Sequence, residues 1–289
     1  MCDNDIHPGL VEDWNVSRRT FMATGAVAAG GISAAANALT MVAVGEKDVS
    51  VKTPDGEADA VLFYPEGKGT WPAVLVWPDI MGLRPVFREL GKRLASAGYV
   101  VLVVNPFYRS RKAPVMEGAI DFNNPDTRKI LMGYRAAMTD AGTDKDAVAF
   151  LNFLDAQPQT NKRKKAGVQG YCMGGPLSFR VAAAVPGRIG AVGSFHGGGL
   201  VTQTPASPHL LISRTKAAYL VAVAQNDDAK APTDKDTLKA AFTAAGRPAT
   251  VEVYPADHGW CVPGSQAYNR DAAERAWTEL EKLYRANLV

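Results

Sequence analysis

Short apolar runs alternate with amphipathic segments along most of this chain. A continuous apolar run bounded by turn residues predicts a buried strand, and apolar residues at helical spacing predict a helix. The first pattern predicts strands at residues 49–53, 58–64, 73–77, 99–104, 166–169, 190–195, 218–224 and 250–254. The second predicts helices at residues 86–97, 146–154, 234–245 and 270–287.

Strands that alternate with helices predict a mostly parallel sheet that is wound on both faces with right-handed crossovers. We expect residues 39–289 to form a single α/β domain of this kind. Pro54-Asp55-Gly56 predicts a hairpin turn between the first two strands. The polar stretch 105–143, called the flap below, is predicted to carry short helices over the site, because such long connections usually have a function. Ligands of these sheets bind beyond the carboxyl ends of the strands.

Residues 1–38 differ from the rest of the chain. Arg18-Arg19 precedes a small-residue, weakly apolar stretch that contains no acidic residue and ends in Ala36-Asn37-Ala38. This order indicates a twin-arginine export signal that is cleaved after Ala38, with a disordered or helical extension as the alternative. We therefore expect the export machinery to be a partner and the protein to be periplasmic or secreted. The apolar stretch is too short for stable membrane insertion.

Composition narrows the function classes further. Apolar residues make up 47% of the 289 residues, which is enough for a large core, and the net charge is only +3. No basic stripe is present, which argues against nucleic-acid binding. Of the three cysteines, Cys2 lies in the leader, so Cys172 and Cys261 remain. One pair is no disulfide framework, although a disulfide between the two remains an alternative.

The sequence Gly170-Tyr171-Cys172-Met173-Gly174-Gly175 follows a predicted strand and opens an apolar helix. This pattern is typical of a nucleophile elbow, in which flanking glycines permit a strained turn that exposes the nucleophile above the sheet. The Met173 N–H would then face the developing oxyanion. The helix N-terminus favours the thiolate of Cys172. The alternative is a tight crossover with an inert cysteine.

A candidate acid and a candidate base follow the elbow in the order that α/β-hydrolases use. Asp227 and Asp228 come after the strand predicted at 218–224, and His258 comes after the next strand. We expect His258 to accept the thiol proton and a carboxylate to orient its ring, with Asp227 preferred and Asp228 as the alternative. A lone His258-x-x-Cys261 pair is weak evidence for a metal, and we predict no metal.

The chain resembles the dienelactone hydrolase (carboxymethylenebutenolidase) family. The resemblance rests on the elbow, on the Asn226-Asp227-Asp228 turn, on His258-Gly259, and on the segments 78–82 and 106–109. It implies an α/β-hydrolase fold and a cofactor-free monomer that opens lactones or esters through an acyl-thiol intermediate. It also implies that Ile80 donates the second oxyanion N–H.

The resemblance comes with two departures. Asp79 stands where the family has glutamate, so the contact with resting Cys172 that the family implies involves a shorter side chain. Arg109 is near the first of two family arginines that bind a substrate carboxylate, whereas Val262 and Pro263 stand where the second is expected. A small neutral lactone or ester is therefore the predicted substrate.

Three further residues are candidates for substrate contact at the ends of strands. These are Tyr108, His196 and Trp260, and packing is the alternative role for each of them. Two other functions remain open for the whole chain. It could be a thiol redox protein that cycles Cys172 and Cys261, or a catalytically inactive hydrolase fold that serves as a binding protein.

Overall fold

Strands and helices alternate along the part of the chain that the computed structural model describes, residues 42–118 and 120–289. The predicted export signal at 1–38 lies outside the described residues and stays a prediction. The strands are β1 (Val44–Thr53), β2 (Gly56–Pro65), β3 (Ala73–Trp77), β4 (Val100–Val104), β5 (Ala166–Tyr171), β6 (Ile189–Phe195), β7 (Ala218–Ala224) and β8 (Ala249–Tyr254). The helices are α1 (Pro85–Ser96), α2 (Pro125–Ala136), α3 (Asp140–Asp155), α4 (Gly174–Ala184), α5 (Pro208–Leu211), the 3₁₀ turn η2 (Ile212–Arg214), α6 (Gln225–Lys230), α7 (Asp234–Ala245) and α8 (Arg270–Asn287).

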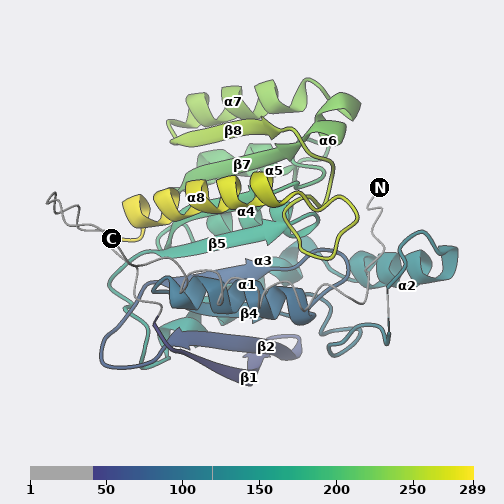
Figure 1. Cartoon of the computed structure of the whole chain (residues 1–289). Coiled ribbons are helices and arrows are strands. Elements are labelled where there is room, and N and C mark those ends of the chain that lie inside the picture. Colours follow the sequence, from purple (N-terminus) through teal and green to yellow (C-terminus); the bar gives the residue numbers. More distant parts are fainter. Residues whose placement is uncertain (1–41, 119) are drawn as a thin grey trace, which may run out of the picture.

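The eight strands form one sheet in the order β1-β2-β4-β3-β5-β6-β7-β8 (Figure 1). β1 and β2 are a hairpin in which Thr53 pairs with Gly56, and β2 is antiparallel to β4. All remaining pairs are parallel. The predicted fold class, a mostly parallel sheet in a single α/β domain, is confirmed.

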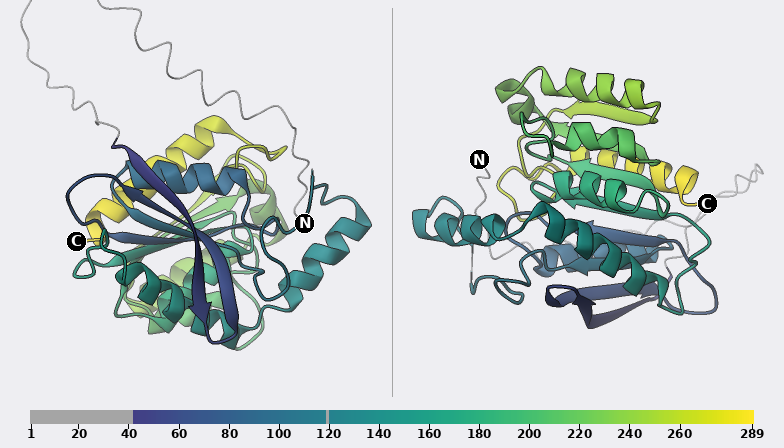
Figure 2. Two further views of the ribbon diagram at one scale, coloured as in Figure 1. Left: turned by 90° about the horizontal axis from the view of Figure 1, so that it is seen from below. Right: turned by 180° about the vertical axis from the view of Figure 1, so that it is seen from behind.

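Helices cover both faces of the sheet, as Figure 2 shows from two further sides. One face packs against α1 and α8, which contribute Phe87 and Leu280 to a buried apolar cluster. The other face packs against α3, α4 and α7, which contribute Phe150, Phe179 and Phe242 to a second cluster. Because the central strands are covered on both sides, β3 and β4 are apolar throughout and show no alternation of apolar and polar residues.

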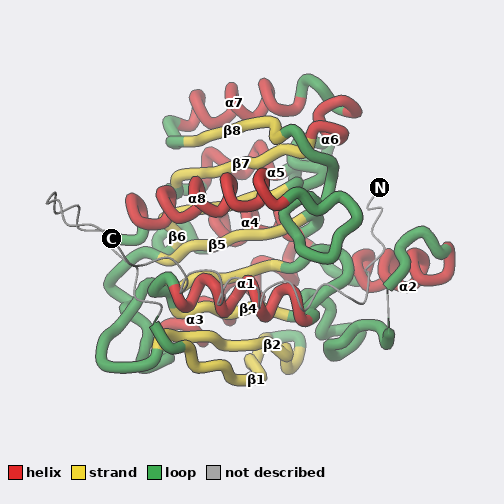
Figure 3. Tube along the Cα trace, in the orientation of Figure 1, coloured by secondary structure: helices red, strands yellow, loops and turns green. Residues whose placement is uncertain are grey.

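The flap and the loop before α8 lie at the same end of the sheet (Figure 3). This is the carboxyl end of the parallel strands, where the arrows of β5, β7 and β8 point (Figure 1). The flap carries α2, which extends away from the sheet and buries only Leu131 among its residues. Among the described residues, no helix is long and apolar enough to cross a membrane.

Candidate active site

Cys172 lies in a sharp turn between β5 and α4. Its φ is +52°, a left-handed conformation that non-glycine residues rarely adopt and that is concentrated at functional sites. The turn closes only because glycines flank it. A Cβ on Gly170 would lie 1.9 Å from the carbonyl oxygen of Gly174, and a Cβ on Gly174 would lie 2.4 Å from that of Trp77. The strand, strained turn and helix expected of a nucleophile elbow are thus present at Cys172.

Apolar side chains pack around Cys172 on the side of the flap. The residue is 7% exposed and belongs to a buried cluster with Ile80, Met81 and Met173. The flap supplies the rest of this cluster, namely Phe107, Val115, Ile120, Phe122 and Leu131. Apolar side chains of the flap therefore cover the elbow, as expected for a site that excludes water during the reaction.

His258 is held by two residues from the segment that follows β7. Its Nδ1 lies 2.5 Å from Oδ2 of Asp227, and its backbone N–H donates to Oδ1 of Asn226 at 2.9 Å. Asp228 points elsewhere, because its carboxylate pairs with Lys235 at 2.7 Å. Of the two candidate acids, the structure therefore places Asp227 against the imidazole. Asn226 was missed as a site residue, although it directly precedes the predicted acid.

His196 lies between the elbow and His258. Tyr171 of β5 pairs with Phe195 of β6, so the residues that follow them, Cys172 and His196, lie side by side at the carboxyl end of these strands. His196 also has a positive φ, +38°, and its ring centroid is 4.7 Å from that of His258. Burial, and then the proximity of His258, hold the pKa of His196 well below 6.5. A neutral imidazole, carried by a strained backbone, therefore lies beside the candidate base.

Neither ring nitrogen of His196 has a hydrogen-bond partner within the described part of the chain. Unsatisfied buried polar atoms are rare and concentrate where function requires them, so the predicted role of His196 in the site keeps its support. Trp260 is fully buried, stacks on Tyr254 at 4.6 Å and lies 6.4 Å from His196. Trp260 thus packs in the core beside His196. Direct contact with substrate stays a prediction for His196 and for Trp260.

Asp79 occupies the turn after β3, and Arg84 binds its carboxylate. The two Asp79 oxygens accept from Nη1 and Nη2 of Arg84 at 2.6 and 2.8 Å. The carboxylate is thus held by an ion pair within the turn, and its contact with resting Cys172, implied by the family resemblance, stays a prediction. Arg84 was missed, since no sequence pattern links a residue to the fifth one after it across a turn.

Ile80 and Met173 present the two backbone N–H groups predicted for an oxyanion hole. Both residues are buried in the cluster that contains Cys172. Within residues 42–118 and 120–289, neither N–H finds a hydrogen-bond acceptor. Buried N–H groups without partners are rare in native proteins, so these two are well suited to bind an oxyanion.

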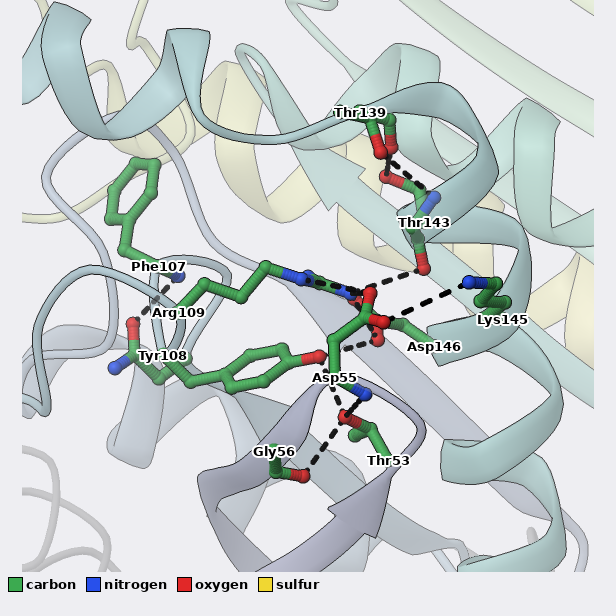
Figure 4. Close-up of polar contacts among 12 residues, drawn as sticks. Thr53, Asp55, Gly56, Phe107, Tyr108, Arg109, Thr139, Thr143, Lys145 and Asp146 are labelled. Carbon is green, nitrogen blue, oxygen red and sulfur yellow. Dashed lines mark hydrogen bonds and ion pairs between the residues drawn. The ribbon is translucent and has the colours of Figure 1, made fainter.

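Tyr108 and Arg109 belong to a separate polar network at the base of the flap (Figure 4). Arg109 binds Asp146 at 2.7 Å and Asp55 at 2.8 Å, and Tyr108 bonds to Asp146 and to Thr53. The guanidinium thus joins α3 to the turn of the β1–β2 hairpin. These contacts give Arg109 a structural role, and they give no support to the predicted binding of a substrate carboxylate.

Cys261 is buried in the core near Tyr171 and Trp260. Burial raises the pKa of its thiol well above 9.0. The structure forms no disulfide between Cys172 and Cys261. Among the described residues, no group of three or more histidine, cysteine, aspartate or glutamate side chains is arranged to hold a metal ion.

Comparisons with known proteins give a consistent result. The model of the dienelactone hydrolase family matches residues 58–288. A relative from Synechocystis sp., named "Putative carboxymethylenebutenolidase", is 25% identical over 244 residues, which cover 83% of this chain and 96% of the relative. The carboxymethylenebutenolidase of Pseudomonas putida is 25% identical over 162 residues, covering 56% of this chain and 65% of that protein. The crystal structure of a "Putative Dienelactone Hydrolase" from Klebsiella pneumoniae superposes with a TM-score of 0.73 at 21% identity and covers 84% of this chain and 99% of that one.

Proposed function

This chain is a hydrolase that belongs to the dienelactone hydrolase family, and from that premise we propose that it cleaves neutral lactones or carboxylic esters with Cys172 as nucleophile, His258 as base and Asp227 as orienting acid. The observation that carries the proposal is the 2.5 Å contact between Asp227 and His258. The strained Cys172 follows β5 and His196 follows the neighbouring strand β6, and the ring of His196 lies 4.7 Å from that of His258.

In the proposed reaction His258 accepts the thiol proton and the sulfur of Cys172 attacks the substrate carbonyl carbon. The carbonyl oxygen becomes an oxyanion that the Ile80 and Met173 N–H groups bind. When the intermediate collapses, the carbon–oxygen bond breaks, His258 protonates the leaving oxygen, and an acyl-thiol remains on Cys172. His258 then takes a proton from water, and the hydroxide attacks the carbonyl carbon of this acyl-thiol. The carbon–sulfur bond breaks, the acid is released, and His258 returns the proton to the sulfur of Cys172.

The charges around the site support a neutral substrate. The cluster around Cys172 is apolar, and Arg84 and Arg109 are already paired with the buried aspartates Asp79 and Asp146. Val262, at the position where the family resemblance implies a second substrate-binding arginine, is 1% exposed and packs in the apolar cluster that contains Phe87 and Leu280. None of these three positions would then offer a free cation to a substrate carboxylate, and an unpaired buried charge is strongly unfavourable.

A panel of p-nitrophenyl esters, simple lactones and dienelactone tests the proposal with the full-length chain. We expect Cys172→Ala to abolish turnover of every substrate that the wild-type protein hydrolyses. Cys261→Ala is the matched control, because it removes the other buried thiol and should leave kcat/KM within about threefold. Turnover that survives in Cys172→Ala would show that another residue is the nucleophile.

A further inference from the structure

We propose that Asp79 and Arg84 form a clamp that holds the Ile80 N–H in place to bind the oxyanion, and that both are positioning residues for the reaction. This inference rests on the proposed function. It starts from the turn that follows β3, in which Asp79 accepts hydrogen bonds from two of the next three N–H groups. Met81 donates to Oδ1 at 3.0 Å, and Gly82 donates to the Asp79 carbonyl oxygen at 2.9 Å. The third N–H, that of Ile80, is thereby left for the site.

Arg84 fixes the rotation of the Asp79 carboxylate. Its planar fork binds both oxygens, and Nη1 also donates to the carbonyl oxygen of Gly82 at 3.3 Å. The guanidinium carbon lies 4.9 Å from the ring centroid of Phe87, and the Arg84 side chain is only 10% exposed. A carboxylate held at both oxygens is not free to turn away from Met81, and a bidentate guanidinium fork supplies that geometric restraint.

The clamped turn also contacts the elbow and the flap directly. Gly174, at the start of α4, packs so closely on the carbonyl oxygens of Trp77 and Pro78 that a Cβ there would lie 2.4 and 2.8 Å from them. Gly82 has φ +72°, and a Cβ on it would lie 3.1 Å from Val115 of the flap. The segments that carry the two oxyanion donors are therefore in contact. A shift of the turn changes the distance between the Ile80 and Met173 N–H groups.

Arg84→Lys tests the clamp, because lysine keeps the charge and loses the bidentate fork. We expect kcat to fall by about 10- to 100-fold, since misplacing one oxyanion donor removes part of its contribution, while KM stays within about threefold. Alkylation of Cys172 by iodoacetamide should keep its rate. In that reaction the sulfur displaces iodide from a saturated carbon, so no oxyanion forms.

Arg88→Lys is the matched control. Arg88 lies one turn further along α1, and it pairs with Glu46 and Asp48 at the surface. This variant should keep both kcat and the alkylation rate. If Arg84→Lys fails to fold, as circular dichroism would show, Asp79→Asn/Arg84→Gln removes both charges together and should show the same loss of kcat with alkylation intact.

The outcomes separate the clamp from the proposed function. A wild-type protein without Cys172-dependent turnover would refute the proposed function, and the clamp with it. With turnover established, the clamp is overturned if the folded variant keeps kcat within about threefold. It is equally overturned if the change appears only in KM, or if kcat and the alkylation rate fall together, because a general distortion of the elbow would do that.

Discussion

Asp227→Asn is the most informative single change at the site, because it removes the charge that faces His258 and keeps the shape of the side chain. In the proposed mechanism His258 becomes an imidazolium when it takes the thiol proton. Two unit charges about 4 Å apart attract by about 4 kcal/mol at an effective dielectric constant of about 20. The Asp227 side chain is 23% exposed, so solvent screens part of this attraction.

A loss of about 2–4 kcal/mol in transition-state stabilisation is therefore expected, which corresponds to about 30- to 1000-fold in kcat/KM. A further loss follows if the new amide donates to Nδ1, because the ring then adopts the tautomer that has no acceptor for the thiol proton. The assay is hydrolysis of a p-nitrophenyl ester at fixed pH, with the melting temperature measured in parallel.

Asp228→Asn is the matched control for this change. Asp228 is the adjacent residue and pairs with Lys235, and both side chains are partly exposed. Pairs of this kind contribute about 0–1 kcal/mol, so activity should change by less than about threefold. The reasoning is refuted if Asp227→Asn keeps wild-type kcat/KM, or if Asp228→Asn is the more damaging of the two.

Two further predictions concern His196 and the substrate. Since the pKa of His196 is lowered in the folded protein, the unfolded chain binds the extra proton first as the pH falls below 6.5. The stability that comes from burying the neutral ring is thus fully present above pH 6.5, and below that pH the free energy of unfolding declines by up to about 1.4 kcal/mol per pH unit. Denaturant unfolding at several pH values should show that His196→Asn lacks this decline. Equal slopes in the two proteins would contradict the lowered pKa. For matched neutral and carboxylated lactones, kcat/KM should favour the neutral one by roughly 10²–10³-fold, and a preference for the carboxylated lactone would mean that an unassigned cation reaches the site.

Most of the sheet could be predicted from sequence, because buried parallel strands are short apolar runs with clear ends. The predicted strands at 73–77 and 218–224 coincide with β3 and β7, and the predicted helices at 234–245 and 270–287 coincide with α7 and α8. The predicted helix at 146–154 is shorter than α3, which begins at Asp140. Its first turn is polar, and the start depends on Thr139, whose hydroxyl accepts from the Gly142 N–H at 3.0 Å.

The parts of the candidate site that depend on neighbouring residues could be predicted from sequence, and the parts that depend on residues far apart along the chain could not. The elbow consists of consecutive residues, and Asp227 and His258 each come shortly after a predicted strand. The partners of Arg109 could not be inferred, since Asp55 and Asp146 lie 54 and 37 residues away along the chain. The short helix α6, which carries Asp227, has no buried residue and hence no apolar pattern that could have predicted it.

Mass mapping of the covalent intermediate tests the central claim most directly. The full-length chain is mixed with a p-nitrophenyl ester, quenched in acid within the first turnover and digested, and the peptide that carries the acyl group is identified. We predict the acyl group on Cys172, in a thioester that hydroxylamine removes. An acyl group found on a serine or another side chain, or steady turnover with Cys172 replaced by alanine, would contradict the account.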